Sequence, residues 1–181
     1  MRSIIFVTTN DNKAREAAHI LGVKVKRISL ELDEIQSMDL ARIVEHKARQ
    51  AYKKLKKPLL VEDVGFYIKE WNGWPGPFIR WMAEHISYEN LVKLIGAERR
   101  VEYVVLCGYF NGKEFKSFKG SIKGTIAKKP RGSNGWGFDV VLIPKGYTKT
   151  YAEMGMKEKM KVSARGQALR KAKKYLTVNY I

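Results

Sequence analysis

The chain has 181 residues and a formal net charge of +17, and 45% of its residues are apolar and 11% aromatic. This composition is typical of a globular protein with a sizeable core and excludes an intrinsically disordered chain. The apolar runs are too short to span a bilayer, and we expect the opening MRSIIFVTTNDNK to form a first strand rather than a signal peptide. The positive charge favours anionic partners, but it does not identify the kind of anion.

Strands and helices alternate in the first half of the chain. Apolar runs predict strands over residues 3–7, 23–28 and 59–61. A first helix is predicted over residues 13–21, and it ends at Gly22. Asp39 is expected to cap a second helix, whose apolar stripe extends from Leu40 to Leu55 before Pro58.

The second half is richer in strands. Ser87 is expected to cap a short helix that ends at Gly96. A long strand over residues 101–110 leads into Asn111–Gly112, the strongest hairpin signal in the chain, and a return strand reaches towards residue 126. Another strand is predicted over residues 139–143, followed by a last helix that Ser163 caps. The predicted fold class is α/β: a mixed, strongly twisted sheet with flanking helices, as a single domain over residues 1–181 with two lobes around a central cleft.

Cys107 is the chain's one cysteine, so no internal disulfide can form. A reducing, cytoplasmic location is therefore expected. The apolar run around Cys107 favours a small core residue over a reactive thiol.

The first polar cluster is TTNDNK, over residues 8–13, between a predicted strand and a predicted helix. Unpaired backbone N–H groups at a helix N-terminus suit a phosphate, and Asn10 and Lys13 add an amide and a positive charge. The pattern is not a Walker A loop. The alternative is an ordinary capped turn.

Acidic residues form the second cluster. Glu31, Asp33 and Glu34 follow the second predicted strand, and Glu62 and Asp63 are expected to close the third. Neighbouring strand residues point to opposite faces, so only one of this last pair needs to face a ligand. Because ligands bind beyond the carboxyl ends of strands in α/β sheets, Asp63 and Glu34 are predicted to converge on Mg²⁺. The alternative is a set of surface acids near lysines.

Two more clusters lie near the C-terminus. In GSNGWGFD, Trp136 or Phe138 can stack on a base, and Asp139 anchors the loop or binds a polar edge. The alternative is a glycine-rich turn with core aromatics. In EKMKVSARGQAL, Arg165 lies in a first helical turn, where the helix dipole disfavours a cation. An anionic or carbonyl partner is therefore expected, and solvent exposure is the alternative.

Other common catalytic patterns are missing from the sequence. The three histidines are scattered, and there is no HExxH motif or Cys/His spacing, so zinc is not expected. No serine nucleophile elbow is present.

In order, these clusters resemble the inosine triphosphate pyrophosphatase family over almost the whole chain. The resemblance depends on the number, order and spacing of the segments TTNDNK, LDEIQ, LVEDVGF, NGWPGPFIRW, FKGSIKGTIA, PRGSNGWGFD, KTYAEM, EKMKVS and ARGQAL. It implies a nucleoside-triphosphate pyrophosphatase, a Mg²⁺-dependent hydrolase of nucleotide metabolism that cleaves ITP, dITP and XTP to the monophosphate and pyrophosphate and so cleans the nucleotide pool. It also implies a homodimer without a specific nucleic-acid or membrane partner.

The resemblance also implies roles for individual residues. Asp63 is the acid at the reaction centre with Glu62 beside it and Lys13 assisting, and Glu34 and Asp63 bind the metal. The resemblance further implies that the segment NGWPGPFIRW packs near the dimer interface and the cleft. The implied substrate-binding residues are Thr8, Thr9, Asn10, Lys13, Phe138, Asp139, Lys159, Ser163, Ala164 and Arg165.

The sequence departs from the family pattern at five positions, while every charged residue of the pattern remains. The departures are Thr9 for Gly, Val64 for Thr or Ser, Val140 for Pro, Met160 for Asn and Ala164 for His. We expect them to affect base discrimination and turnover more than metal and phosphate binding. Two alternative hypotheses about function are therefore considered. One is a pyrophosphatase with shifted base specificity, and the other is a catalytically weak, basic protein that binds nucleotides or nucleic acid.

Overall fold

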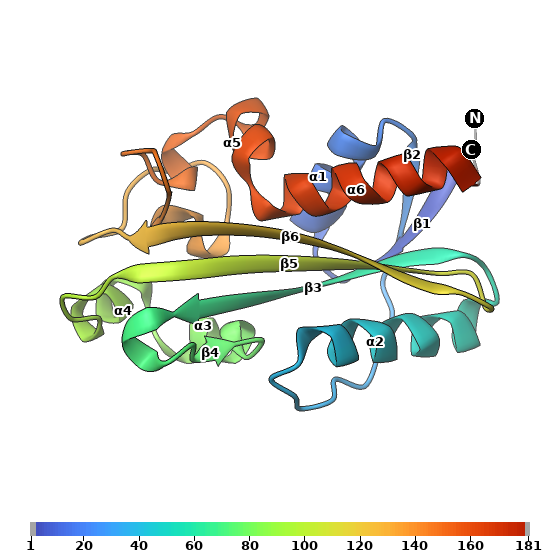
Figure 1. The fold of residues 1–181 in the computed structure, drawn as a ribbon, viewed down its shortest axis with the longest axis horizontal. Helices are drawn as coiled ribbons and strands as arrows, with labels where there is room; N and C mark the ends of the chain where they lie inside the picture. The colour runs from blue at the N-terminus through green and yellow to red at the C-terminus, as the bar shows by residue number, and fades with distance from the viewer. Residues whose placement is uncertain (1–2, 180–181) are drawn as a thin grey trace. The chain divides into compact units, whose positions relative to one another are not determined.

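Strands that lie between Ser3 and Pro144 form one mixed sheet in this computed structural model, which describes residues 3–179 (Figure 1). The strand order is β2-β1-β3-β5-β6-β7, and β4 pairs with β3. β1 is parallel to β2 and β3, whereas β4 is antiparallel to β3 and β7 to β6. The predicted mixed α/β fold is confirmed.

The chain divides into two compact units. Unit 1 comprises residues 1–63, 105–120 and 165–181, and unit 2 comprises residues 64–104 and 121–164. Three strands contribute to both units: β3 (Leu59–Ile68), β5 (Arg100–Phe110) and β6 (Phe115–Ile126). The assignment of a single domain stays a prediction.

Unit 1 contains the elements predicted from the N-terminal half. They are β1 (Ser3–Val7), α1 (Asp11–Leu21), β2 (Lys24–Ile28) and α2 (Leu40–Leu55). Asn10 caps α1 by accepting hydrogen bonds from two backbone N–H groups, so the helix begins two residues before the predicted start. Asp39 caps α2 in the same way, and Gly22 ends α1 at a φ of 67°.

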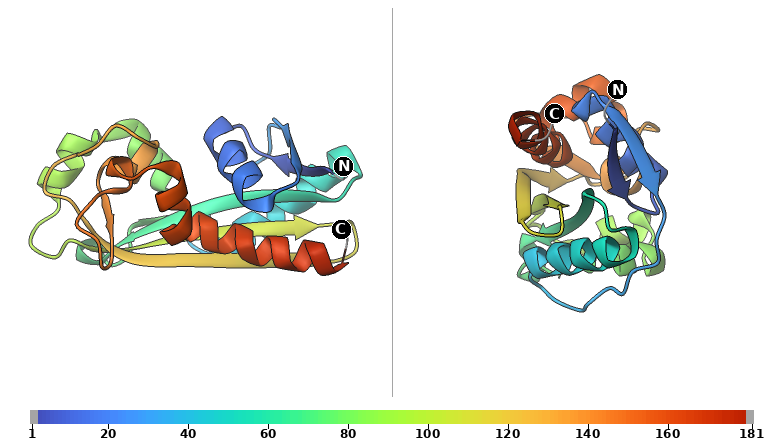
Figure 2. Two further views of the ribbon diagram at one scale, coloured as in Figure 1. Left: turned by 90° about the horizontal axis from the view of Figure 1, so that it is seen from above. Right: turned by 90° about the vertical axis from the view of Figure 1, so that its right-hand side faces the viewer.

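The helices α2 and α6 (Ala164–Asn179) cover opposite faces of β5 in unit 1 (Figures 1 and 2). The ring of Tyr175 on α6 lies 6.0 Å from that of Tyr109. The ring of Tyr52 on α2 lies 5.2 Å from that of Phe110. Because successive strand residues point to opposite faces, adjacent positions on β5 serve the two helices.

The predicted hairpin between β5 and β6 is confirmed. The Asn111 side chain accepts hydrogen bonds from the backbone N–H groups of Lys113 and Glu114, and Gly112 has a φ of 97°. Such a left-handed conformation favours glycine.

Unit 2 contains short elements that sequence patterns did not all reveal. It holds η1 (Lys69–Trp71), β4 (Pro75–Gly76), α3 (Ile79–His85), α4 (Tyr88–Leu94), η2 (Gly137–Val140), β7 (Leu142–Pro144), η3 (Tyr151–Glu153) and α5 (Met156–Val162). Ser87 caps α4 as predicted. The helices α3 and α5 were not predicted, because seven residues are too few for a clear helical period and, unlike α4, neither has a side-chain cap.

Cys107 is fully buried, as expected for a core residue. Burial, and secondarily the Glu62 carboxylate, raise the pKa of its thiol far above the ordinary value. The thiol therefore stays neutral at physiological pH. In the part of the chain that the structure describes, no helix is both long and apolar enough to cross a membrane.

Candidate active site

The acidic pair lies in the middle of β3, and the prediction that the strand ends on these acids is wrong. β3 continues to Ile68 because β4 pairs with Phe66 and Tyr67 further along it. β1 is the strand that stops here: its Phe6 pairs with Leu60, and it ends one residue later, at Val7. The acids therefore lie beside the carboxyl end of β1, where a parallel α/β sheet presents ligand sites.

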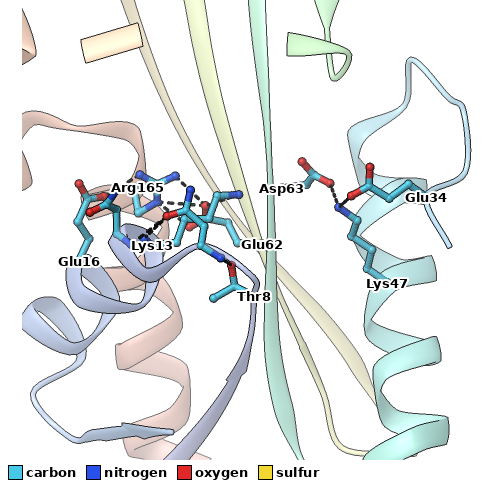
Figure 3. A network of polar contacts seen from close by, with 10 residues as sticks. Thr8, Lys13, Glu16, Glu34, Lys47, Glu62, Asp63 and Arg165 are labelled. Atoms are coloured by element: carbon cyan, nitrogen blue, oxygen red, sulfur yellow. Dashed lines mark hydrogen bonds and ion pairs between the residues drawn. The ribbon is translucent and has the colours of Figure 1, made fainter. Parts of the chain in front are cut away.

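Glu62 and Asp63 point to opposite sides of β3, as the strand period requires (Figure 3). Glu62 faces α1 and α6 and is buried, whereas Asp63 faces α2 and is partly exposed. The two carboxylates thus belong to separate polar networks within unit 1.

The network around Glu62 centres on Arg165. The guanidinium Nε donates to both oxygens of Glu62 at 3.0 and 2.9 Å, and Nη2 donates to Oε1 at 2.8 Å. Nη1 donates to Glu16 Oε2 at 2.6 Å. The anionic partner expected for Arg165 is confirmed, and the solvent-exposed alternative is wrong, because Arg165 is only 2% exposed.

Lys13 completes this network from the first turns of α1. Its Nζ lies 3.4 Å from Glu62 Oε1, and its side chain is 14% exposed. Two carboxylates and two cations therefore balance their charges in a largely buried cluster. Sequence reasoning missed Glu16, which is 1% exposed on the buried side of α1. A carboxylate on an apolar helix face was the signal that could have found it.

The network around Asp63 centres on Lys47 of α2. Its Nζ donates to Asp63 Oδ2 at 2.6 Å and to Glu34 Oε1 at 2.9 Å (Figure 3). Asp63 and Glu34 therefore converge on the Lys47 ammonium group, and their convergence on Mg²⁺ stays a prediction. Burial by itself lowers the pKa of Lys47, but the two carboxylates outweigh it and raise that pKa above 10.5, so Lys47 is charged at neutral pH.

The sequence patterns did not identify Lys47 as a site residue either. It lies three and four residues after Val44 and Ile43, on the buried stripe of α2. A lysine at a stripe position is unusual unless it is paired, and this was the available signal.

The TTNDNK turn is a capped helix start. Asn10 Oδ1 accepts hydrogen bonds from the N–H groups of Asn12 and Lys13 at 2.9 and 3.2 Å, and Thr8 Oγ1 accepts from Asn10 N–H at 3.1 Å. The turn is thus capped, which is compatible with both interpretations of this segment. It leaves phosphate binding open, because a capped first turn still carries the positive end of the helix dipole.

Asp139 anchors its loop in unit 2, as one of its two expected roles. Its Oδ2 accepts hydrogen bonds from Trp136 N–H at 2.8 Å and from Lys159 Nζ at 2.6 Å. Both Asp139 and Lys159 are buried. The predicted strand from residue 139 is wrong at its start, because this capping contact draws residues 137–140 into η2.

Aromatic rings surround the other candidate residues of this loop. The ring of Phe138 lies 4.7 Å from that of Phe66 and 5.2 Å from that of Tyr88. The ring of Trp136 lies 5.8 Å from the Lys159 ammonium, a cation–π contact. Burial, and secondarily the Asp139 charge, raise the pKa of Tyr88, so its phenol stays neutral.

Ser163 and Ala164 lie where α5 ends and α6 begins. The backbone N–H of Ser163 already donates to the Lys159 carbonyl at 2.8 Å. Both residues are buried. The Ser163 N–H is therefore already engaged within the protein.

Glu34 and Asp63 have the donor chemistry of a magnesium site. Among residues 3–179, no group of three or more His, Cys, Asp or Glu side chains could enclose a metal. Mg²⁺, however, commonly uses only one or two carboxylates and completes its shell with water and substrate phosphates. Lys47 Nζ, in contact with both carboxylates, marks a place that already attracts positive charge. The pair therefore fits the ion.

A mixed α/β sheet with carboxylates and ammonium groups gathered beside a strand end is typical of enzymes that act on phosphate compounds. The chain belongs to the Ham1 family, whose model matches residues 4–175. This match confirms that the resemblance seen in the sequence extends over nearly the whole chain.

Similar proteins cover nearly the same length. The chain is 39% identical to the dITP/XTP pyrophosphatase of Methanopyrus kandleri over 92% of each protein. It is 36% identical to the inosine triphosphate pyrophosphatase of Yarrowia lipolytica, over 96% of this chain and 95% of that protein. The structure of a HAM1 protein from Coxiella burnetii covers 98% of the chain, with a TM-score of 0.84 and 25% identity, and is itself covered in full.

Proposed function

We propose that this protein is a nucleoside-triphosphate pyrophosphatase that hydrolyses ITP, dITP and XTP to the monophosphate and pyrophosphate. The observation that carries this proposal is the convergence of Asp63, Glu34 and Lys47 beside the end of β1. The names of the relatives from Methanopyrus kandleri and Yarrowia lipolytica support the substrate class. Removal of such nucleotides from the pool is the proposed cellular role, in the cytoplasm.

Residues of unit 1 handle the phosphates and the attacking water in this proposal. Asp63 orients the water and accepts its proton as a general base. Glu34 and Asp63 would hold Mg²⁺, which supplies charge neutralisation at the phosphate oxygens. Thr8, Thr9 and Asn10 form the turn that receives the triphosphate, and Lys13 offsets the negative charge that develops on leaving pyrophosphate.

Glu62 has a different role from Asp63. Its carboxylate is bound by Arg165 and lies 3.4 Å from Lys13, so it orients the lysine rather than contacting water. Arg165 holds the Glu62 carboxylate in place, and Glu16 in turn binds the Arg165 guanidinium.

A second set of residues handles the base in this proposal. Phe138 or Trp136 supplies the stacking surface, and two protein rings already contact Phe138. Asp139 holds the loop and Lys159, which adds positive charge to the site. Donors near Ser163, Ala164 and Arg165 read the base in this proposal. Backbone N–H groups are the better candidates, because the Arg165 guanidinium already binds two carboxylates.

A homodimer is part of the proposal. Trp74 and Trp81, in the segment NGWPGPFIRW, are 45% and 51% exposed. Large exposed rings in one segment suit a self-complementary interface.

A shifted base specificity is the second candidate. Ala164 replaces the histidine of the family pattern, and no imidazole can then contribute to base selection at this position. The charge of +17 would also suit a protein that only binds nucleotides or nucleic acid. This hypothesis is weaker than the two enzyme hypotheses, because carboxylates repel phosphates unless a cation bridges them.

Pyrophosphate release from inosine, xanthosine, guanosine and adenosine triphosphates, with Mg²⁺ and with EDTA, tests the proposal. We expect release from the first two with Mg²⁺ and none with EDTA. Efficient turnover of other bases alone would favour shifted specificity. Salt-sensitive binding to DNA without any hydrolysis would overturn the enzyme assignment in favour of a binding protein.

A further inference from the structure

Glu34 lies in a segment that has no secondary structure of its own. Residues 29–39 connect β2 to α2 without forming a helix or a strand. A backbone of this kind has no ladder of hydrogen bonds to fix its side chains. The orientation of Glu34 must therefore come from contacts with other elements.

Gln50 of α2 supplies such a contact to the residue before Glu34. Its Oε1 accepts a hydrogen bond from Asp33 N–H at 3.0 Å, and its Nε2 donates to the Asp33 carbonyl at 3.1 Å. The side-chain amide thus pairs with both backbone groups of Asp33, as a neighbouring strand would. Nε2 also contacts His46 Nε2, one turn earlier on the same helix.

Two lysines hold the same segment on either side of Gln50. Lys54 Nζ donates to the Glu31 carbonyl at 2.6 Å, and Lys47 Nζ donates to the Glu34 carboxylate at 2.9 Å. Positions 47, 50 and 54 are three and four residues apart, so they lie on one face of α2. This face of the helix is therefore hydrogen-bonded to Glu31, Asp33 and Glu34.

We propose that Gln50 is a positioning residue that fixes the backbone at Asp33 and thereby aims the Glu34 carboxylate at the metal. Lys54 reinforces the same segment. The role in metal binding rests on the function proposed above, whereas the hydrogen bonds from α2 to residues 31–34 do not. Gln50 touches no substrate in this assignment and acts through Glu34.

Two measurements on the metal-free chain, without nucleotide, test the proposal. In Gln50→Ala, amide hydrogen exchange at Asp33 should become about ten-fold faster or more, because opening the segment no longer breaks a side-chain bond. The affinity for Mn²⁺, measured by electron paramagnetic resonance, should fall about ten-fold, as is typical when an outer partner of a metal ligand is lost. Gln50→Glu keeps the acceptor for Asp33 N–H but loses the donor, so it should give intermediate values.

Lys54→Ala and Lys53→Ala form a matched pair with the same loss of charge. Lys53 is an exposed neighbour on α2, and only Lys54 bonds to the segment. Lys54→Ala should speed exchange at residues 31–34, whereas Lys53→Ala should not. Thermal melting of each variant checks that the fold is retained, and Gln50→Glu replaces Gln50→Ala if that variant does not fold.

Unchanged amide hydrogen exchange at Asp33 in the Gln50 variants would contradict the claim that Gln50 fixes this backbone segment. Faster exchange with unchanged Mn²⁺ affinity would overturn the positioning role. Absence of pyrophosphate release by the unaltered protein would count against the proposed function instead, and both readouts would stand without it.

Discussion

Glu62 and Asp63 are adjacent in the sequence, yet each serves a different network. The strand period turns Glu62 towards Arg165 and Lys13, and Asp63 towards Lys47 and Glu34 (Figure 3). The first network is largely buried and its charges balance within the protein. The second is more exposed and suits contact with an ion and a substrate. Glu62 therefore suits a structural role, and Asp63 suits the reactive role proposed for it.

Asp63→Asn should reduce hydrolysis at least about 100-fold, because the amide cannot accept a proton from water at neutral pH. Asn is nearly isosteric with Asp, so the fold should persist. Pyrophosphate release and thermal melting check the two parts. Asp33→Asn is the matched control, because Gln50 binds the backbone of Asp33, and its turnover should stay near normal. Near-normal turnover in Asp63→Asn would remove this residue from the reaction centre.

Lys13→Ala should weaken triphosphate binding by about 1–3 kcal/mol, the usual worth of one charge-assisted contact. The lysine is largely buried beside Glu62, and its loss leaves Arg165 to neutralise that carboxylate. Titration calorimetry with a non-hydrolysable triphosphate measures the change. Arg15→Ala removes an exposed cation from the same helix, bonded to Asn12, and should have little effect. Equal affinities for Lys13→Ala and the unaltered chain would refute the phosphate contact.

At the scale of elements, the end of a strand or turn depends both on its local sequence and on the strands that pair with it. Polar residues made the sequence pattern of β3 end at Val61, but pairing with β4 carries the strand to Ile68. The hairpin after β5 shows the opposite case, since Asn111 and Gly112 specify the turn by themselves. A strand end is thus less predictable than a turn, because it depends on the partner that lies beside it.

Gly112→Ala should destabilise the hairpin by about 1–3 kcal/mol, because a side chain at a φ of 97° is strained. The added Cβ would also collide with the Tyr52 ring of α2. Urea unfolding measures the loss. Gly155→Ala is the control: it has ordinary φ and no atom within 4 Å of an added Cβ, so its loss should be smaller. Equal losses in the two variants would contradict a conformational requirement at Gly112.

At the scale of the whole molecule, the charge of +17 suits an anionic substrate but does not choose its base. The acids that carry the proposed metal and water belong to unit 1, and the loop with Trp136, Phe138 and Asp139 belongs to unit 2. In the proposed function, the departures at Val140, Met160 and Ala164 lie next in sequence to residues assigned to the base or its loop, so we expect them to affect selectivity first.

Inosine triphosphate should be preferred over adenosine triphosphate by roughly ten-fold to a hundred-fold in kcat/KM. Backbone N–H groups only donate, and a 6-oxo purine presents an acceptor where adenine presents a donor. A buried donor left unpaired costs about 1–3 kcal/mol, enough for this ratio. Discrimination against guanosine triphosphate should be weaker, because guanine shares the 6-oxo group. Equal kcat/KM for the inosine and adenosine substrates would overturn a donor-only base site.

Sequence patterns predicted much of the fold because many of its elements have local causes. The caps at Asn10 and Asp39 and the turn at Asn111–Gly112 use hydrogen bonds between residues at most three positions apart, and such bonds can be inferred from neighbours alone. The candidate acids were recognised in the same way, by residue type and by their place beside strands.

Only the tertiary structure decided which partner each acid has. Arg165 reaches Glu62 across 103 sequence positions, and Lys47 reaches Asp63 across 16. Gln50 and Glu16 carried no motif, and their contacts exist because α1, α2 and α6 pack beside β3 and the segment before α2. Local hydrogen bonding sets where helices, turns and many strands form, whereas the packing of distant segments sets which charges meet. That is why the sequence by itself indicated a site for phosphates, and the fold was needed to assign its carboxylates to separate tasks.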